Sequence, residues 1–160
     1  MKLWHFYHVY ARENASNVWI PIVTEHVNFL RFSELGQKFN KTYIGVVGNK
    51  VDAEKILTIF TDGGIKCELC AIDDLGWEQL TLNKLYEFSL QNSGYVLYAH
   101  TKGAAHQDQT RNTHRRVMNE HLIGKWAEHI DLLSKGFCAT GVLFLRGSPE
   151  EPFILSLIHI

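Results

Sequence analysis

Four short runs of apolar, β-branched and aromatic residues alternate along this chain with segments of helical periodicity, and no other feature restricts its fold as strongly. The runs cover residues 3–11, 43–48, 65–72 and 94–100. A short apolar run that ends in turn residues is typical of a strand buried on both faces of a sheet. Strands that alternate with helices indicate parallel pairing through crossover connections. We therefore predict an α/β fold, a Rossmann-like three-layer α/β/α domain with a mainly parallel sheet.

The segments between these runs carry the apolar spacing of amphipathic helices. Trp19, Val23 and Val27 lie about one helical turn apart, and Gly36 is expected to end this first helix. The other expected elements, in chain order, are a helix over residues 51–60 that Gly63 breaks, a helix capped by Thr81, one uninterrupted helix over residues 110–135, and one or two strands over residues 137–145. No linker interrupts this order, so we expect a single domain.

The composition is that of one globular domain with no dominant charge. The chain has 160 residues, 46% of them hydrophobic, and a formal net charge of −1. A chain so close to neutral has no overall field that would attract nucleic acid or an anionic membrane. It has no apolar stretch near the roughly 20 residues of a membrane span, and its first residues lack the pattern of a signal peptide. These features predict a cytoplasmic protein with no nucleic-acid partner and no transmembrane segment.

The last six residues, Leu155 to Ile160, need a separate interpretation. Their sequence, LSLIHI, matches the translation of a transposon mosaic-end adapter used in sequencing libraries. We expect this tail to be non-native, which leaves a domain over residues 1–154 that is incomplete at its C-terminus. The alternative is a genuine apolar strand at the end of the chain.

Cysteines and histidines invite a metal interpretation that their spacing does not favour. Cys67 and Cys70 have the spacing of a metal knuckle or redox pair, but they fall in a strand, where residues three apart point to opposite faces. His5 and His8 are separated in the same way. The histidines expected in the long helix do not share the four-residue spacing of a helical metal pair: His114, His121 and His129. Packed thiols and structural or surface histidines are the favoured interpretation.

The fourth apolar run changes abruptly into His100, Thr101, Lys102 and Gly103. In an open α/β sheet, ligands bind beyond the carboxyl ends of the strands, where these residues would lie. Lys102 offers a positive charge next to a glycine whose backbone an anion can approach, and His100 can donate to a phosphate, ligate a metal or transfer a proton. Together they suit a diphosphate. A polar strand end with a solvated lysine is the competing interpretation.

Standard nucleotide and hydrolase motifs are absent. The chain has no Gly-x-Gly-x-x-Gly, no Gly-x-x-x-x-Gly-Lys-Ser/Thr, no Gly-x-Ser-x-Gly and no His-Glu-x-x-His. This argues against a dinucleotide dehydrogenase, a P-loop nucleotidase, an α/β-hydrolase and a zinc protease of that motif.

The stretch Tyr98-Ala99-His100-Thr101-Lys102-Gly103 resembles a motif, Tyr-x-His-Thr-Lys-Gly, of glycosyltransferase-like proteins of bacteria and phages. These proteins have a GT-A type domain and are similar to rhamnan-synthesis proteins. Further matching segments follow in the same order as in that group: residues 4–10, residues 19–26 with 33–36, residues 81–86, and Arg115 to Met118. The last segment resembles a Trp-Arg-x-x-Met pattern, with His114 in the tryptophan position, so the assignment of Arg115 is open to a slip of one residue.

The resemblance implies a glycosyltransferase that moves a sugar from a nucleotide-sugar donor to a glycan or other acceptor in surface polysaccharide synthesis, with the inner membrane surface as a setting. It implies that Lys102 and Arg115 supply positive charge to the departing diphosphate, with His100 as a third catalytic candidate and Thr101 and Gly103 beside the phosphates.

Other site residues follow from their places at strand ends. Tyr10, Asp73 and Asp74 are candidates for contacts to the base and ribose. No carboxylate pair stands where GT-A enzymes hold a metal, so Mn²⁺ or Mg²⁺ is not required; alternatively, His100 ligates one together with Asp73 or Asp74. No catalytic base can be named. The alternative function is a non-catalytic α/β module that binds a nucleotide or glycan.

Overall fold

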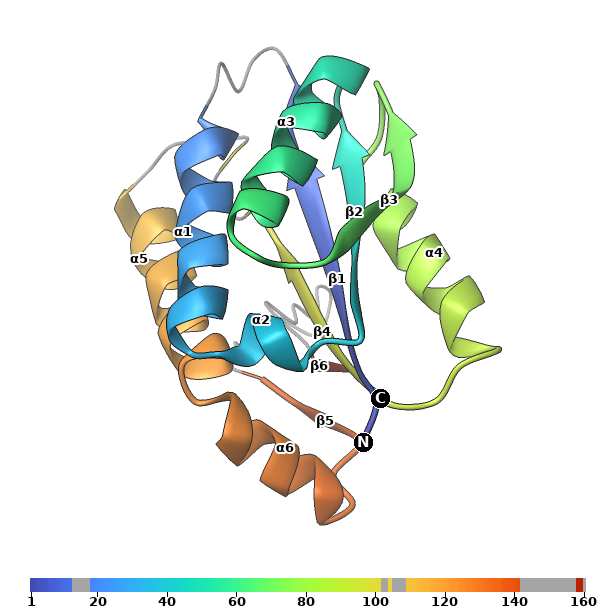
Figure 1. Ribbon diagram of the computed structural model, residues 1–160, viewed down its shortest axis with the longest axis vertical. Helices are drawn as coiled ribbons and strands as arrows, with labels where there is room; N and C mark the ends of the chain where they lie inside the picture. Colours follow the sequence, from blue (N-terminus) through green and yellow to red (C-terminus); the bar gives the residue numbers. More distant parts are fainter. Residues whose placement is uncertain (13–17, 102–103, 105–108, 142–157, 160) are drawn as a thin grey trace, which may run out of the picture.

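The computed structural model describes residues 1–12, 18–101, 104, 109–141 and 158–159, and they form a sheet between helices (Figure 1). Four strands run parallel: β1 (Leu3–Tyr10), β2 (Lys41–Val47), β3 (Cys67–Asp73) and β4 (Tyr95–His100). Two short antiparallel strands, β5 (Ala139–Thr140) and β6 (Ile158–His159), extend the sheet, whose order is β3-β2-β1-β4-β6-β5. The predicted α/β class and its mainly parallel sheet are confirmed.

The helices divide between the two faces because the chain reverses its direction across the sheet. The described helices are α1 (Trp19–Phe32), α2 (Leu35–Lys38), α3 (Lys50–Asp62), α4 (Gln79–Ser89), α5 (Gln109–Met118), a π-helical segment η2 (Asn119–Ile123) and α6 (Trp126–Ser134). From β1 the chain moves outward to β2 and β3 through α1 and α3, and then returns through α4 to β4 on the other side of β1. Right-handed crossovers place helices of opposite travel on opposite faces.

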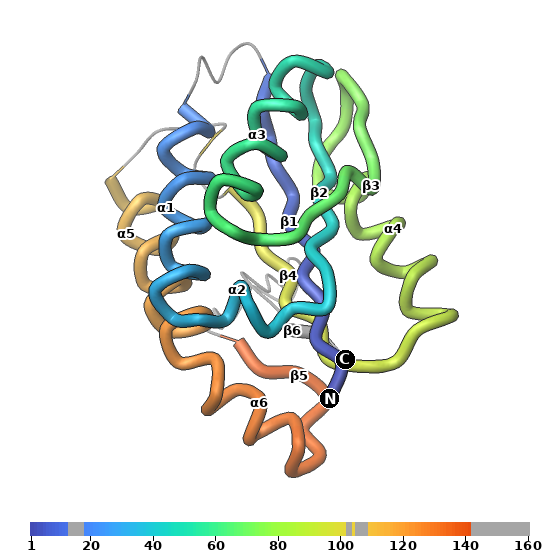
Figure 2. Tube along the Cα trace, viewed as in Figure 1, coloured from blue at the N-terminus to red at the C-terminus, as the bar shows by residue number. Residues whose placement is uncertain are grey.

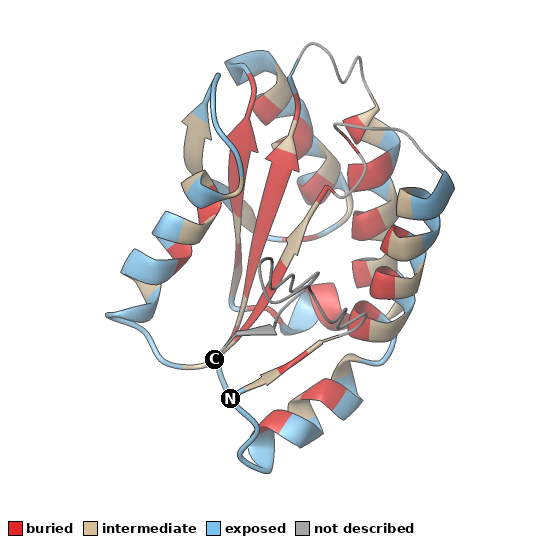
Figure 3. Ribbon diagram, turned by 180° about the vertical axis from the view of Figure 1, so that it is seen from behind, coloured by how far each residue is buried: buried red, intermediate tan, exposed pale blue. Residues whose placement is uncertain are grey.

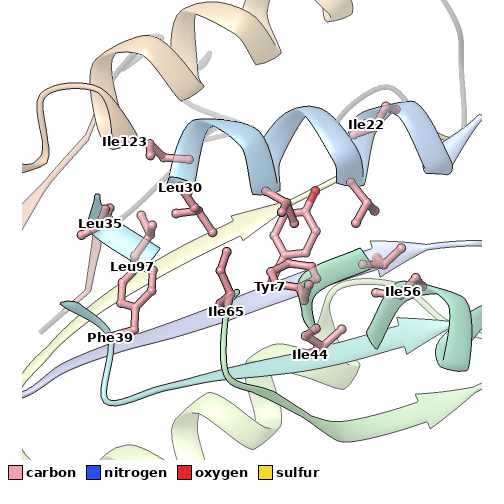
Figure 4. Packing of buried hydrophobic residues seen from close by; sticks show 14 of the residues in the cluster. Tyr7, Ile22, Leu30, Leu35, Phe39, Ile44, Ile56, Ile65, Leu97 and Ile123 are labelled. Carbon is pink, nitrogen blue, oxygen red and sulfur yellow. The ribbon is translucent and has the colours of Figure 1, made fainter. Parts of the chain in front are cut away.

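The larger core lies between the sheet and the layer of α1 and α3. Tyr7 and Val9 of β1 point into it, and Figure 4 shows Tyr7 beneath α1 with Ile56 and Ile44 nearby. A smaller cluster on the opposite face joins Phe6 to Leu85 of α4. In Figure 3 the central strands are buried along most of their length, whereas α4 is exposed on its outer side. Burial on both faces explains the continuous apolar runs of the central strands. The third run was wrongly expected to be buried in this way: β3 is the edge strand of the sheet, and none of its residues is fully buried.

Two helix boundaries differ from the sequence prediction. The first helix ends at Phe32 and not at Gly36, because Glu34 adopts a left-handed conformation with φ of 61° that interrupts it. Gly36 instead belongs to α2, where a Cβ would lie 3.1 Å from the Ile65 side chain. Thr81 is not a cap either: it lies inside α4, fully buried against the sheet.

The helix expected over residues 110–135 is divided into three parts, and Figure 2 shows the chain changing direction between α5 and α6. The Gly124 N–H donates to the carbonyl of Asn119 at 3.0 Å, a spacing of five residues that is typical of a π-helix. A Cβ at Gly124 would lie 2.3 Å from the Glu120 carbonyl oxygen, so glycine permits this turn. Beyond it, Trp126 starts α6 and its indole N–H donates to the Ser33 carbonyl at 3.1 Å.

The two cysteines of β3 point to opposite faces, as predicted. The Cys67 thiol contacts the Leu57 carbonyl of α3 at 3.8 Å, whereas Cys70 lies on the side of Lys84 in α4. The β2–β3 register shifts between Ile44 and Gly45, which leaves Cys70 as the extra residue of a bulge. Burial raises the pKa of Cys70 to about 11, so this thiol stays protonated at neutral pH.

The end of the chain contributes two short strands. The predicted strand region 137–145 yields β5, and residues 142–157 lie outside the described part. The backbone of β6, within the segment interpreted as adapter-derived, pairs with β4 and β5. The origin of that segment stays a prediction. Among the described residues, every helix is too short or too polar to span a lipid bilayer.

Candidate functional site

The carboxyl ends of β1 and β4 meet where the chain reverses its direction across the sheet. Such a reversal is the position at which open α/β sheets bind their ligands. Here a side chain joins the two strands: the Tyr10 N–H donates to the Thr101 hydroxyl oxygen at 2.9 Å, and the Thr101 N–H donates to the His8 carbonyl at 3.0 Å. Thr101 is buried, so its hydroxyl oxygen holds the seam between the strands.

The neighbouring strand ends complete one edge of the sheet. Asp73 ends β3, and its carbonyl accepts the Gly48 N–H at 2.8 Å, which ties it to the end of β2. The carboxylate of Asp73 accepts the Leu75 N–H at 3.0 Å, and this bond lowers the pKa of Asp73 below its usual value. Asp73 and Asp74 are both exposed. The edge therefore offers carboxylates to solvent near, but not within, the seam of β1 and β4.

An aromatic pair projects from this edge. The Trp77 ring stacks on the Tyr10 ring, with centroids 5.4 Å apart and planes at 13°. Trp77 is 62% exposed although it is a large aromatic side chain. An exposed, nearly parallel stack offers a flat surface to a base or sugar ring.

A cluster of polar side chains lies on the α4 side of the same edge. His100 Nδ1 and Glu78 Oε1 are 2.5 Å apart, and His8 Nδ1 lies 2.7 Å from the Thr81 hydroxyl. Burial lowers the pKa of His8 to about 4, so this imidazole is neutral at pH 7. The buried Tyr98 hydroxyl has no hydrogen-bond partner among the described residues, and burial followed by the charge of Glu78 raises its pKa. The cluster therefore combines a close histidine–carboxylate contact with neutral donors.

The structure brings together some of the residues that the sequence singled out. Tyr10, Thr101 and His100 gather at the seam of β1 and β4, and Asp73 ends a strand along the same edge. Asp74 follows Asp73 into the loop that leads to α4. Lys102 and Gly103 lie outside the described residues.

Arg115 lies on the other face of the sheet. Its guanidinium contacts Glu25 of α1, with Nε–Oε2 at 3.0 Å and Nη2–Oε2 at 2.9 Å, and donates to the Asn112 side chain at 2.8 Å. His100 faces α4 instead. The role of Arg115 at the diphosphate stays a prediction from sequence, but the contacts of Arg115 seen here join α5 to α1.

Replacing Arg115 by methionine tests whether this arginine is structural. Arg115→Met should lower the free energy of unfolding by about 2 kcal/mol, because it removes the closest guanidinium from the partly buried Glu25 carboxylate, which Arg116 contacts at the longer distance of 3.7 Å. Urea denaturation would measure the loss, with Arg31→Met, at an exposed position on α1, as the control. Unchanged stability combined with weaker nucleotide binding would contradict the structural role and support a role of Arg115 in ligand binding.

The described residues contain no group of three or more histidine, cysteine, aspartate or glutamate side chains arranged to hold a metal ion. The pair that the sequence offered, His100 and Asp73, comes from β4 and β3, which two other strands separate. Nδ1 of His100 is occupied by Glu78.

A comparison with protein families gives one match, and it covers most of the chain. A family model described as a domain of unknown function, DUF8361, matches residues 6–138. The chain belongs to this family. Searches of curated proteins and of solved structures return no match.

The residues that match DUF8361, 6–138, include every residue of the site described above, from His8 of β1 to Arg115 of α5. Sequence reasoning missed Trp77 and Glu78 of this DUF8361 domain, which lie in the loop before α4. A signal existed, since a tryptophan and a carboxylate between a strand end and a helix start face the edge where ligands bind. His8 and Thr81 gave no such signal, because their contact joins positions 73 residues apart.

Proposed function

We propose that this DUF8361 domain binds the diphosphate of a nucleotide-sugar at the seam of β1 and β4 and acts as a GT-A-like glycosyltransferase. The reversal of chain direction at that seam carries the proposal, because it coincides with the His100–Thr101 end of β4 and with Tyr10 of β1. The acceptor would be a glycan of surface polysaccharide synthesis, assembled at the cytoplasmic side of the inner membrane.

The edge offers groups of the kinds that a nucleotide-sugar requires. The exposed stack of Trp77 on Tyr10 suits a planar base. The exposed carboxylates of Asp73 and Asp74 suit ribose hydroxyls, which donate hydrogen bonds. For the phosphates, the sequence supplies Lys102 directly after Thr101.

Sugar transfer requires positive charge next to the diphosphate that leaves. When the bond between the sugar and the diphosphate breaks, the diphosphate gains negative charge that the protein must stabilise. A lysine ammonium can provide this without a metal, and a divalent ion remains an optional partner in the proposal.

Thermal stability with nucleotides tests the binding half of the proposal. We expect UDP, GDP or dTDP to raise the melting temperature, since a ligand that binds the folded state stabilises it by mass action. Each nucleotide is measured with Mn²⁺ and with chelator, and release of diphosphate from UDP-glucose, GDP-mannose and dTDP-rhamnose measures turnover. No shift with any nucleotide would refute the proposal. Binding without turnover would favour the non-catalytic nucleotide-binding module.

Lys102 provides the sharpest variant for the same assay. Lys102→Ala should weaken nucleoside diphosphate binding by about 10- to 100-fold, because a charge-assisted hydrogen bond contributes roughly 1.5–3 kcal/mol. The melting temperature without ligand should stay unchanged. Isothermal calorimetry would measure the affinity, and Lys125→Ala, at an exposed lysine between η2 and α6, is the control. Equal losses of stability and affinity would mean that Lys102 is structural.

A further inference from the structure

His100 and Glu78 form a pair that the sequence did not suggest. His100 is the last residue of β4, and Glu78 precedes the first turn of α4. His100 Nδ1 lies 2.5 Å from Glu78 Oε1, and their side chains are 19% and 40% exposed. Both groups are thus held by the fold and remain reachable from solvent at the edge that carries the proposed donor site.

We infer that His100 is the general base of the transfer reaction and that Glu78 is its positioning residue. The inference rests on the proposed function and adds to it the base that the sequence left unnamed. An ionised carboxylate only accepts hydrogen bonds, so Glu78 requires the proton of a neutral His100 on Nδ1. The lone pair of the imidazole is then on Nε2, which has no hydrogen-bond partner among the described residues.

The reaction balances with these two groups and the two substrates. The acceptor hydroxyl gives its proton to Nε2 of His100 while its oxygen bonds to the anomeric carbon of the donor sugar. The bond from that carbon to the diphosphate oxygen breaks, and the nucleoside diphosphate leaves with the electron pair. Glu78 stabilises the resulting imidazolium through the Nδ1–H bond, and the proton later passes to solvent. This single displacement inverts the anomeric centre.

The surroundings fix the pair in place. The Glu78 carbonyl accepts N–H groups of Thr81 and Leu82 at 3.0 and 2.9 Å, which anchors its backbone to the start of α4. His8, the other imidazole in the cluster, is bound to Thr81 and is buried. Of the two imidazoles, His100 is therefore the accessible one. A base whose partner is rigidly placed needs little reorganisation during the reaction.

Kinetics of matched variants test the role of His100. His100→Gln should lower turnover of the responsive nucleotide-sugar by at least about 100-fold, within the usual range for loss of a general base. Calorimetric affinity for the nucleoside diphosphate and the melting temperature should hardly change. Glu78→Gln should lower turnover by at least about tenfold. His121→Gln and Glu120→Gln, which change side chains of the π-helical segment on the opposite face, serve as controls.

The tautomer of His100 tests the premise that Nδ1 carries the proton and leaves Nε2 as the basic nitrogen, whereas the loss of turnover at unchanged affinity and melting temperature separates a catalytic role from a structural one. In ¹⁵N-resolved NMR at neutral pH we expect a neutral ring protonated on Nδ1, and a shift toward the Nε2–H form in Glu78→Gln. A doubly protonated ring or an Nε2–H ring in the unaltered protein would overturn the inference, as would full turnover in His100→Gln. Diphosphate binding with no turnover of any donor would also overturn it and leave the binding site standing. Absence of binding would remove the proposed function itself.

Discussion

Gly45→Ala should unfold this domain at a melting temperature roughly 10 °C lower, the largest effect that we expect from a single substitution. A Cβ at Gly45 would lie 1.9 Å from Oγ1 and 2.9 Å from Cβ of Thr81. Thr81 is fully buried, and its hydroxyl is held 2.7 Å from His8 Nδ1. Relief of the overlap must move α4 or break that contact, which costs about 3 kcal/mol, at the upper end for overpacking. For a domain of this size each kcal/mol lowers the melting temperature by roughly 2–4 °C.

Two variants isolate the cause of this loss. Gly45→Ala combined with Thr81→Ala removes the atoms that collide, so the double variant should lose less stability than the sum of the two single variants. Gly64→Ala is the control for the loss of a glycine: nothing lies within 4 Å of its Cβ position, and its φ of 75° predicts a cost of about 1 kcal/mol. Equal losses for Gly45→Ala and Gly64→Ala in thermal denaturation would refute the steric explanation.

Acidification should destabilise the protein in a window set by buried histidines. Burial lowers the pKa of His26 and of His8 to about 4, and burial together with His26 lowers that of His5 well below its ordinary value. The unfolded chain binds a proton at each of these rings near pH 6.5 while the folded chain does not. Their effect on stability is therefore absent above that pH, and stability falls as the pH drops from about 6.5 to about 4, below which His8 and His26 cause no further loss. At pH 5 the expected loss is about 2 kcal/mol for each of His8 and His26.

The contact between His5 and His26 adds to burial in keeping these two rings neutral. Asn119 Oδ1 can only accept, so His26 donates from Nδ1 at 3.4 Å and accepts on Nε2 from His5 Nε2–H at 3.2 Å. His5 Nδ1 then accepts from the Thr42 hydroxyl at 3.2 Å. Each ring uses one donor and one acceptor, and an added proton would put two donors face to face in the core.

Urea denaturation at pH 7.0 and 5.0 measures this effect. His26→Gln should reduce the loss of stability between the two pH values, although it lowers stability at pH 7.0 by removing part of the network. His121→Gln, at a partly exposed histidine of the π-helical segment, should leave the loss unchanged. The explanation would fail if the free energy of unfolding fell by the same amount between pH 7.0 and 5.0 in both variants and in the unaltered protein.

The sheet was predictable from sequence because short apolar runs are typical of buried strands. The break near Gly124 in the helix expected over residues 110–135 was not predictable. Met118, Leu122 and Trp126 keep a helical spacing through that point, so the apolar pattern continues while the backbone changes to a π turn. Thr81 was predicted as a helix cap because threonine is favoured at that position. In the structure its side chain instead fills the space that the missing side chain of Gly45 leaves in the core.

The candidate site was predictable as an edge but not as a set of contacts. Strand ends placed Tyr10, Asp73 and His100 on the same edge, since parallel strands end together. Which face each side chain takes depends on register and on the helix that covers it, and no local pattern encodes this. Arg115 and His100 thus lie on opposite faces of the sheet, and Glu78 contacts His100 although the two residues are 22 positions apart in sequence.

The threonine hydroxyl at the seam of β1 and β4 restricts how this edge can vary. Backbone hydrogen bonds between strands tolerate almost any side chain, but the Thr101 hydroxyl oxygen accepts the Tyr10 N–H, so only a residue with a side-chain acceptor can preserve this bond. Valine would fill the same volume and leave a donor without its acceptor. The last bond between β1 and β4 at the proposed ligand edge therefore depends on one side-chain oxygen atom, next to the backbone bond from the Thr101 N–H to the His8 carbonyl.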